Sequence, residues 1–305
     1  IGLTLSRSVA AQNRDQGSWR LYYEPARDRV QLTFENFEGR GRGGMTSFGV
    51  NPSELRGLTA DQLAASSTPV RFQLVRDAGT FNFDGTIRSG RGTGFFTFAP
   101  DARFPQQLQS RGYARPSDEQ QFQLALHNVG YALLDEIRVQ RYPQPSVEDL
   151  VTMGMHGANL EYIRGLSAAG YHVENVHRLI TLRDHGVSPS FINGLSREGY
   201  SRLDLDDLLV LRDHGVDPDF IVALREFGFR NLTTDQLLTA RDHGVSAGFA
   251  REFRELGYTG LSIRDLVRLR DHGVTADYAR RSRATDGRLV PIENLIRRRD
   301  RGETE

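Results

Sequence analysis

The segment Arg-Asp-His-Gly-Val occurs four times in this chain, and each copy begins 29 residues after the previous one. The copies start at Arg183, Arg212, Arg241 and Arg270. Weaker copies keep the same period at His127-Asn128-Val129, at Met155-His156-Gly157-Ala158 and at Asp300-Arg301-Gly302. A fixed period of about 20–50 residues is typical of stacked supersecondary units. This repeat limits the possible folds more than any other feature of the sequence.

Aromatic residues keep the same period at two further positions. One is Tyr or Phe after a glycine, as in Tyr171, Tyr200, Phe229 and Tyr258. The other is represented by Tyr162, Phe191, Phe220, Phe249 and Tyr278. Because large apolar groups at repeated positions are usually buried between neighbouring units, we expect these rings to form an inter-repeat core and not a platform for stacking nucleic-acid bases.

Each unit predicts two short helices. In the unit that follows Leu203, Asp204 or Asp206 can cap the first helix, and Gly215 can end it in the left-handed conformation. Asp217 can then cap the second helix, with Pro218 at its first position. One such pair cannot bury both apolar faces alone, whereas stacked pairs form a continuous core. The sequence therefore predicts an α-solenoid of about seven 29-residue helical hairpins over residues 99–305.

Five histidines share one repeat position: His156, His185, His214, His243 and His272. Each precedes a glycine, in the strong copies Gly186, Gly215, Gly244 and Gly273. Equivalent residues of stacked helices lie about 8–10 Å apart, which is too far for two of them to bind one zinc ion at about 2.0–2.1 Å. We expect these histidines to bind carbonyls at the helix end, with the adjacent Asp pairing with the His or with the next Arg, and we expect no metal or cofactor.

Residues 17–98 have the two-residue periodicity of antiparallel strands, which predicts an N-terminal β domain. A hairpin is expected around Pro25–Asp28, and one or two helical turns over 52–65. Three further strands are expected at Val70–Arg76, Thr80–Ile87 and Gly94–Phe98, with turns at Asp77–Gly79 and Ser89–Gly92. One buried face should contain Phe72, Leu74, Phe81, Phe83, Phe96 and Phe98.

The ends of the array also carry signals. No Pro/Gly/Ser linker separates the β domain from Phe104, so we expect an α+β fold in which the β domain caps the solenoid. At the far end, Gly287, Arg301 and Glu303 replace repeat residues, as expected of a polar capping unit. Residues 1–16 form a short stub with small residues at Val9-Ala10-Ala11, which fits the remnant of an export signal or anchor, or else an edge strand.

Composition excludes several kinds of chemistry. The chain has 39 basic and 39 acidic residues and no cysteine, and every basic residue is arginine. Schiff-base lysines, P-loop lysines and cysteine nucleophiles are therefore absent, and the balanced charge disfavours nucleic acid as a partner. The glycine-rich segments Gly39–Gly44 and Gly90–Gly94 lack the strand–helix context of a phosphate-binding loop. Turns or bulges are expected there, with an anion- or RNA-contacting loop as the alternative.

The C-terminal part of the chain is rich in arginine. Arg280, Arg281, Arg283, Arg297, Arg298 and Arg299 could form a docking patch for an acidic partner. Nearby acidic residues dilute this charge, so we expect a solvated capping surface, with a docking patch for an acidic partner or headgroup as the alternative.

The repeat, together with a β region that contains Trp19 and the stretch Ala78–Gly85, resembles the C-terminal extracytoplasmic region of some bacterial sensors of the BlaR/M56 metallopeptidase type. The resemblance covers the chain from about Trp19 onward. The zinc-binding His-Glu-x-x-His helix of that family is absent, so no peptidase activity is implied. The resemblance implies an exported, membrane-proximal binding role.

We therefore predict a non-catalytic, protein-binding or scaffolding module that is periplasmic or otherwise extracytoplasmic and associated with a membrane. Its partner would be a protein, such as a membrane protein or complex, held through the solenoid face. Two alternatives are an accessory subunit of a respiratory or photosynthetic membrane complex and the ectodomain of a membrane sensor. The sequence leaves a cytoplasmic location open.

Overall fold

The computed structural model describes residues 16–37, 44–282 and 288–303. The chain folds into two compact units, one formed by residues 1–164 with 172–180 and the other by 165–171 with 181–305. An antiparallel sheet is followed by repeated helices, which confirms the predicted α+β class. The stub at residues 1–15, most of the first glycine-rich segment, Arg283 and Gly287 lie outside the described residues.

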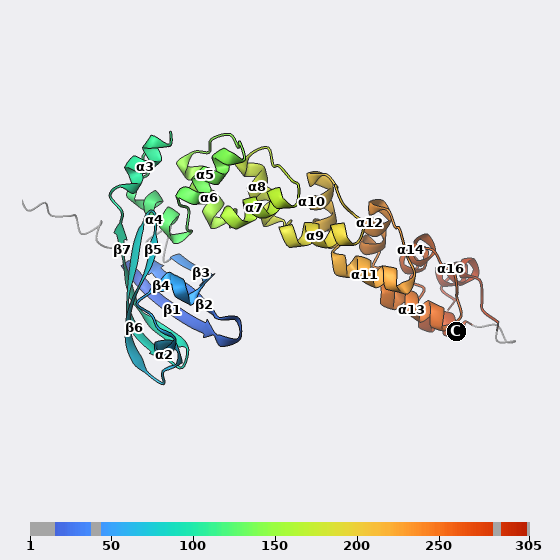
Figure 1. Cartoon of the computed structure of the whole chain (residues 1–305). Coiled ribbons are helices and arrows are strands. Elements are labelled where there is room, and N and C mark those ends of the chain that lie inside the picture. Colours follow the sequence, from blue (N-terminus) through green and yellow to red (C-terminus); the bar gives the residue numbers. More distant parts are fainter. Residues whose placement is uncertain (1–15, 38–43, 283–287, 304–305) are drawn as a thin grey trace, which may run out of the picture. The chain divides into compact units, whose positions relative to one another are not determined.

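Seven strands form one sheet in the first unit (Figure 1). They are β1 (Gln16–Glu24), β2 (Arg29–Phe37), β3 (Gly44–Val50), β4 (Leu55–Arg56), β5 (Thr68–Arg76), β6 (Gly79–Arg88) and β7 (Arg91–Pro100). Their order across the sheet is β3-β2-β1-β7-β6-β5-β4, and neighbouring strands run antiparallel. The predicted hairpin around Pro25–Asp28 joins β1 to β2.

The sheet curls around an aromatic core. The ring of Phe34 on β2 lies 5.0 Å from that of Phe81 and 5.6 Å from that of Phe83, both on β6, although β1 and β7 separate these strands in the sheet. A flat sheet could not bring such distant strands into contact, because adjacent strands lie about 4.8 Å apart. All six residues predicted for the buried face are buried: Phe72, Leu74, Phe81, Phe83, Phe96 and Phe98.

Trp19 explains why Gly92 lies inside a strand and not in the predicted turn, and why a second glycine, Gly94, follows it in that strand. Its indole Nε1 donates hydrogen bonds to the backbone oxygens of Asp84 and Phe95, at 3.2 and 3.1 Å. A Cβ atom on Gly92 or Gly94 would lie 2.7 or 2.8 Å from the indole ring, so only glycine leaves room for it. The predicted turn at Ser89–Gly92 is therefore too long: β7 already begins at Arg91, and both glycines belong to it.

The remaining elements are helical. Residues 52–65 contain a 3-10 turn (Pro52–Glu54), the short strand β4 and α2 (Ala60–Ala64), as predicted in outline. The helices that follow are α3 (Phe104–Ser110), α4 (Asp118–Leu126), α5 (Tyr131–Val139), α6 (Val147–Met155), α7 (Leu160–Ala168), α8 (Val176–Asp184), α9 (Pro189–Arg197), α10 (Leu205–Asp213), α11 (Pro218–Phe227), α12 (Thr234–Asp242), α13 (Ala247–Glu255), α14 (Ile263–Asp271), α15 (Ala276–Arg281) and α16 (Ile292–Asp300).

Within the first unit, α4 closes one end of the aromatic core. The Phe122 ring lies 5.6 Å from that of Phe81 and 5.3 Å from that of Phe98, in edge-on contacts. The buried side-chain amide of Gln121 donates to the backbone oxygens of Ala78 and Asp101, at 2.8 and 2.9 Å. The sheet therefore packs directly on the first helices, as the missing linker predicted.

In the second unit, helices contact the equivalent helix of the next hairpin. Contacts join α9 to α11, α11 to α13 and α13 to α15, and they join α12 to α14 and α14 to α16. Figure 1 shows these helices as two rows, with α10, α12, α14 and α16 in one and α9, α11 and α13 in the other. Apolar residues such as Leu211 and Leu224 are buried between the rows.

Local capping explains why each helix is short. The Asp204 carboxylate, and not that of Asp206, caps α10 by accepting from the backbone N–H of Asp207 at 2.8 Å. Gly215 follows with φ 72°, and the Val216 N–H then reaches back to the Leu211 oxygen at 2.8 Å. This is the Schellman ending, which stops a helix at a left-handed glycine. The predicted glycine stop is confirmed.

Candidate functional site: the polar ladder and outer surface of the array

The histidines of the second unit join neighbouring repeats. The Nδ1 atom of each lies 2.5–2.7 Å from a carboxylate oxygen 28 residues further along, in the pairs His185–Asp213, His214–Asp242, His243–Asp271 and His272–Asp300. The expected bond from His to a carbonyl of its own helix is not the contact found in these four pairs. In these four pairs the Asp instead accepts from the His of the preceding repeat, which forms a ladder along this part of the array.

The ladder fixes which ring nitrogen of each histidine carries the proton. A carboxylate only accepts hydrogen bonds, so Nδ1 carries the proton in each neutral ring and Nε2 is left as an acceptor. Within residues 16–37, 44–282 and 288–303, no group of three or more His, Cys, Asp or Glu side chains is placed to hold a metal ion. His156, at the same repeat position in the first unit, is the C-cap residue of α6.

The arginines of the motif reach in the opposite direction. The guanidinium carbon lies 4.0–5.3 Å from an aromatic ring centre of the preceding repeat, in the pairs Arg212–Phe191, Arg241–Phe220, Arg270–Phe249 and Arg299–Tyr278. Arg270 Nε also donates to the backbone oxygen of Gly244 at 3.0 Å. Arg, Asp and His of one motif therefore all contact an adjacent repeat, and cation–π contacts of this kind stabilise a partly exposed pair by about 0.5–1 kcal/mol.

Tyrosine hydroxyls form a second set of bridges between repeats. The hydroxyls of Tyr171, Tyr200 and Tyr258 donate to the backbone oxygens of Leu203, Leu232 and Val290, each 32 residues further along, at 2.6–2.8 Å. Burial raises the pKa of Tyr171 and of Tyr200 above the ordinary tyrosine value, which keeps these donors protonated. These rings pack between repeats as predicted, but the hydroxyl bridge is not evident from the sequence.

Phe229 breaks this series. It has no hydroxyl to reach the Leu261 carbonyl, which occupies the equivalent position 32 residues further along. A hollow of about 370 Å³ lies beside Phe229, and its lining includes Arg230, Gln236, Thr239, Arg264 and Val267. The hollow places an aromatic ring, two arginines and three neutral polar residues, of which Ser262 is the third, around one space between α12 and α14.

In two junctions, a glycine in the second helix of one repeat packs against a proline at the start of the second helix of the next repeat. A Cβ atom on Gly165 would lie 2.5 Å from Pro189 Cγ, and a Cβ atom on Gly194 would lie 2.5 Å from Pro218 Cγ. In the next junction both partners are alanine, at Ala223 and Ala247. A proline at the start of the second helix of one repeat therefore coincides with a glycine in the second helix of the repeat before it.

The outer surface of the first helices varies from repeat to repeat. A buried leucine occupies the same place in each of four helices: Leu208, Leu237, Leu266 and Leu295. The residue two places before this leucine and the residue two places after it are mostly exposed, and they differ from helix to helix. The pairs are Asp206 and Val210, Asp235 and Thr239, Arg264 and Arg268, and Glu293 and Arg297. We call these eight residues the variable column. They change from acidic and apolar on α10 to mainly basic on α14 and α16.

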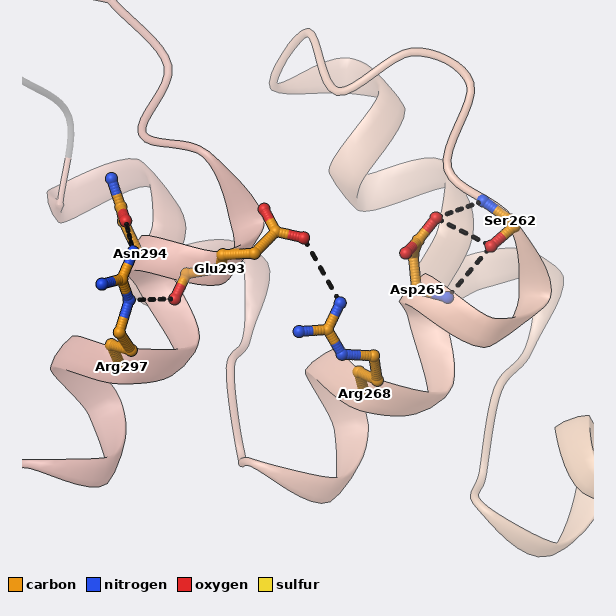
Figure 2. A network of polar contacts seen from close by, with 6 residues as sticks. All are labelled: Ser262, Asp265, Arg268, Glu293, Asn294 and Arg297. Atoms are coloured by element: carbon orange, nitrogen blue, oxygen red, sulfur yellow. Dashed lines mark hydrogen bonds and ion pairs between the residues drawn. The ribbon is translucent and has the colours of Figure 1, made fainter.

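The variable column is bonded internally near its end. Arg268 on α14 lies 3.3 Å from the Glu293 carboxylate on α16 (Figure 2). Arg297 donates to the side-chain oxygen of Asn294 at 2.6 Å and to the backbone oxygen of Glu293 at 3.4 Å. Figure 2 also shows Ser262 and Asp265, the capping box that begins α14.

The predicted arginine patch is only partly available to a partner. Arg297 is bonded as described above, Arg299 stacks on Tyr278, and Arg280 forms an ion pair with Asp277. Arg281 is exposed on α15, and Arg298 is half-buried on α16. The patch is therefore less exposed than the run of arginines in the sequence suggests, because capping and stacking already use several of its side chains.

One histidine of the first unit is partly buried. His127 ends α4, and its Cβ lies against the backbone of α6, where a Cβ atom on Gly154 would approach to 2.7 Å. Burial lowers the pKa of His127 to about 4, because the charged form loses hydration. This side chain is a neutral packing residue at neutral pH.

The sequence could have revealed the ladder but not the hollow. A His–Asp spacing of 28 in a 29-residue repeat places the two side chains at adjacent positions of neighbouring repeats, whereas the hollow depends on how Phe229 packs.

No helix among the described residues has the length and apolarity needed to cross a bilayer. Comparisons of the chain with protein-family models, with curated proteins and with solved structures found no match.

Proposed function

We propose that this chain is a non-catalytic binding module that holds a protein partner on the variable column of its helical array. The observation that carries the proposal is the contrast within each repeat. Arg, Asp and His of the repeated motif contact adjacent repeats, while the exposed positions beside the buried leucines differ from helix to helix. Repeat proteins commonly bind partners through such extended surfaces.

The hollow beside Phe229 supplies an anchoring point on that surface. Interfaces depend on a few buried aromatic or arginine contacts in pockets, and the hollow offers a phenyl ring flanked by Arg230 and Arg264. A partner with an acidic and an aromatic side chain close together would match this chemistry. The acidic Asp206 and Asp235 further along the column would then favour a basic segment of the same partner.

We further propose that the partner is a membrane protein or membrane-associated complex outside the cytoplasm. This part of the proposal rests on the resemblance to sensor ectodomains alone. In such an arrangement the chain would stabilise an assembly or transmit a signal within it, and it would carry out no chemical step.

The test is cross-linking and affinity recovery from native membranes with the full chain as bait. Wild type is compared with Arg264→Glu on the variable column and with Arg251→Glu, which makes the same change at an exposed position of α13. We expect a defined set of proteins with wild type and with Arg251→Glu, and its loss with Arg264→Glu. Equal recovery by all three chains would contradict binding through the variable column, and recovery of nucleic acid alone would contradict a protein partner.

A further inference from the structure

Among the described strands, β3 forms one edge of the sheet and lacks protection against pairing. It is the last strand in the sheet order, and among the described residues it pairs with β2 alone. Its seven residues, Gly-Met-Thr-Ser-Phe-Gly-Val, include no charged residue and no proline. One side of the strand therefore has backbone N–H and C=O groups that face no described strand, which is a template for pairing with another chain.

The opposite edge of the same sheet has the usual protection. There β4 is only two residues long and pairs with Gln73 and Leu74 of β5. The rest of β5 has Pro69 and an exposed Arg71. Short edge strands, prolines and charges are the devices by which proteins prevent unwanted strand pairing, and β3 has none of them.

The side chains of β3 also leave the core incomplete. Phe48 stacks on Phe34, with ring centres 5.6 Å apart and planes 25° apart, yet it is only half-buried because no described strand lies beyond it. On the other face of the strand, Met45 is 70% exposed. An added strand would cover Phe48 with its inward side chains and Met45 with its outward ones.

We propose that β3 binds an extended segment of a partner protein as an eighth strand of the sheet. The occupant is an extended strand, because only an extended backbone satisfies a row of alternating donors and acceptors. It is uncharged and has an apolar residue opposite Phe48, because β3 has no charged residue to pair with a charge. Exposed sheet edges bind extended peptide segments of partner proteins by such augmentation, and a second copy of this chain is the occupant that the experiment below tests against. This surface is separate from the variable column, so either proposal can fail alone.

The experiment selects binders for the full chain from a phage-displayed library of random peptides. Enriched sequences are synthesised with and without methyl groups on alternate backbone nitrogens, and their Kd is measured by fluorescence anisotropy. Thr46→Lys places a charge on the inward side of β3, and Met45→Lys places one on the outer side. Thr97→Lys is the matched control on the central strand β7, at an exposed position. The fluorescence of Trp19 verifies that each variant is folded.

We expect alternating uncharged sequences whose binding protects the amides of Met45–Val50 from hydrogen exchange. Thr46→Lys, or Met45→Lys if the first variant does not fold, should weaken binding by about tenfold or more, as should N-methylation, while Thr97→Lys should not. Binders unaffected by N-methylation, or protection elsewhere in the chain, would overturn the proposal. A dimer in light scattering that Thr46→Lys dissociates would identify a second copy as the occupant and would equally overturn it.

Discussion

The imidazole Nδ1 of His214 lies 2.6 Å from the carboxylate Oδ1 of Asp242, one residue short of a full repeat along the chain. Both side chains are just under half exposed, at 44% and 45%, so water screens the attraction. The pair is one step of a ladder that the next two repeats continue without change in residue type.

His214→Gln should therefore lower the free energy of unfolding modestly, by about 0.3–1 kcal/mol. Chemical denaturation of the single variants and of the double variant with Asp242→Asn should show a coupling between the two sites. Strictly additive losses would contradict a direct pair. Stoichiometric zinc in the purified protein, lost on His214→Gln, would contradict the structural role.

Leu224→Ala should cost about 2–5 kcal/mol, the usual range for removing a fully buried leucine side chain. Glu226→Ala, two residues further along α11 and exposed, should change stability by less than about 0.5 kcal/mol. Urea denaturation followed by circular dichroism measures both. A loss below about 0.5 kcal/mol for Leu224→Ala would show that the buried face of α11 is assigned wrongly.

Phe229→Tyr should stabilise the array by about 0.5–1.5 kcal/mol, because it restores the hydroxyl bridge that Tyr200 and Tyr258 make to the following repeat. Phe227→Tyr adds the same hydroxyl to the neighbouring ring and should have no such effect. Thermal denaturation of both variants distinguishes them. If the two tyrosines raised the Tm equally, the Leu261 carbonyl would not be the acceptor.

The free energy of unfolding should decrease as the pH is lowered, because His127 takes up a proton more readily in the unfolded chain. Burial lowers its pKa in the folded chain to about 4, whereas an unfolded histidine titrates near about 6.5. Between these values the unfolded chain binds the proton and the folded chain does not, so the free energy of unfolding decreases as pH falls through this window and levels off below about 4. The contribution has a limit of about 1.4 kcal/mol per pH unit.

The unfolding free energies of wild type and His127→Gln are measured at pH values between these two pKa values. The comparison with the variant is needed because other groups also titrate in this range. The wild type should lose stability more steeply than the variant. Parallel curves would mean that folding does not lower the pKa of His127.

Gly94→Ala should destabilise the β domain by about 3 kcal/mol or more, because the new Cβ would lie 2.0 Å from the Asp84 oxygen and 2.8 Å from the Trp19 indole nitrogen. Trp19 is the sole tryptophan, so its emission reports the change directly. Ala99→Gly near the end of the same strand controls for altered strand propensity. A native emission spectrum and an unchanged Tm for Gly94→Ala would contradict the close packing.

Much of the helical array could be predicted because its signals are local and repeated. Pro218 after Asp217 begins a helix, and Gly215 and Gly228 end one, whatever lies around them. Repetition then confirms each weak signal several times. The choice between Asp204 and Asp206 as the cap could not be made, because both are adequate caps and only the exact start of α10 distinguishes them.

The contacts of the candidate site depended on information that a single repeat does not contain. Within one repeat, His214 has only the carbonyls of its helix and Asp213 as candidate partners, and Asp242 becomes a candidate only when the 28-residue His–Asp spacing is followed into the next repeat. In the β domain, Gly92 and Gly94 have the composition of a turn, and only the position of Trp19 across the strands shows why they lie inside β7. Both errors arise from contacts between residues far apart in the chain.

The fit of Gly194 against Pro218 restricts how such an array can evolve. Unequal recombination adds or removes whole 29-residue units, and every event creates one new junction. A duplicate of the unit that contains Pro189 and Gly194 presents a glycine to a proline and fits at once. The unit that has Glu252 at the position of this glycine, if placed before a proline-bearing unit, would force a long side chain into the space that glycine leaves. The array can therefore lengthen readily from its glycine–proline units, and its history should be recorded in the order of these junctions.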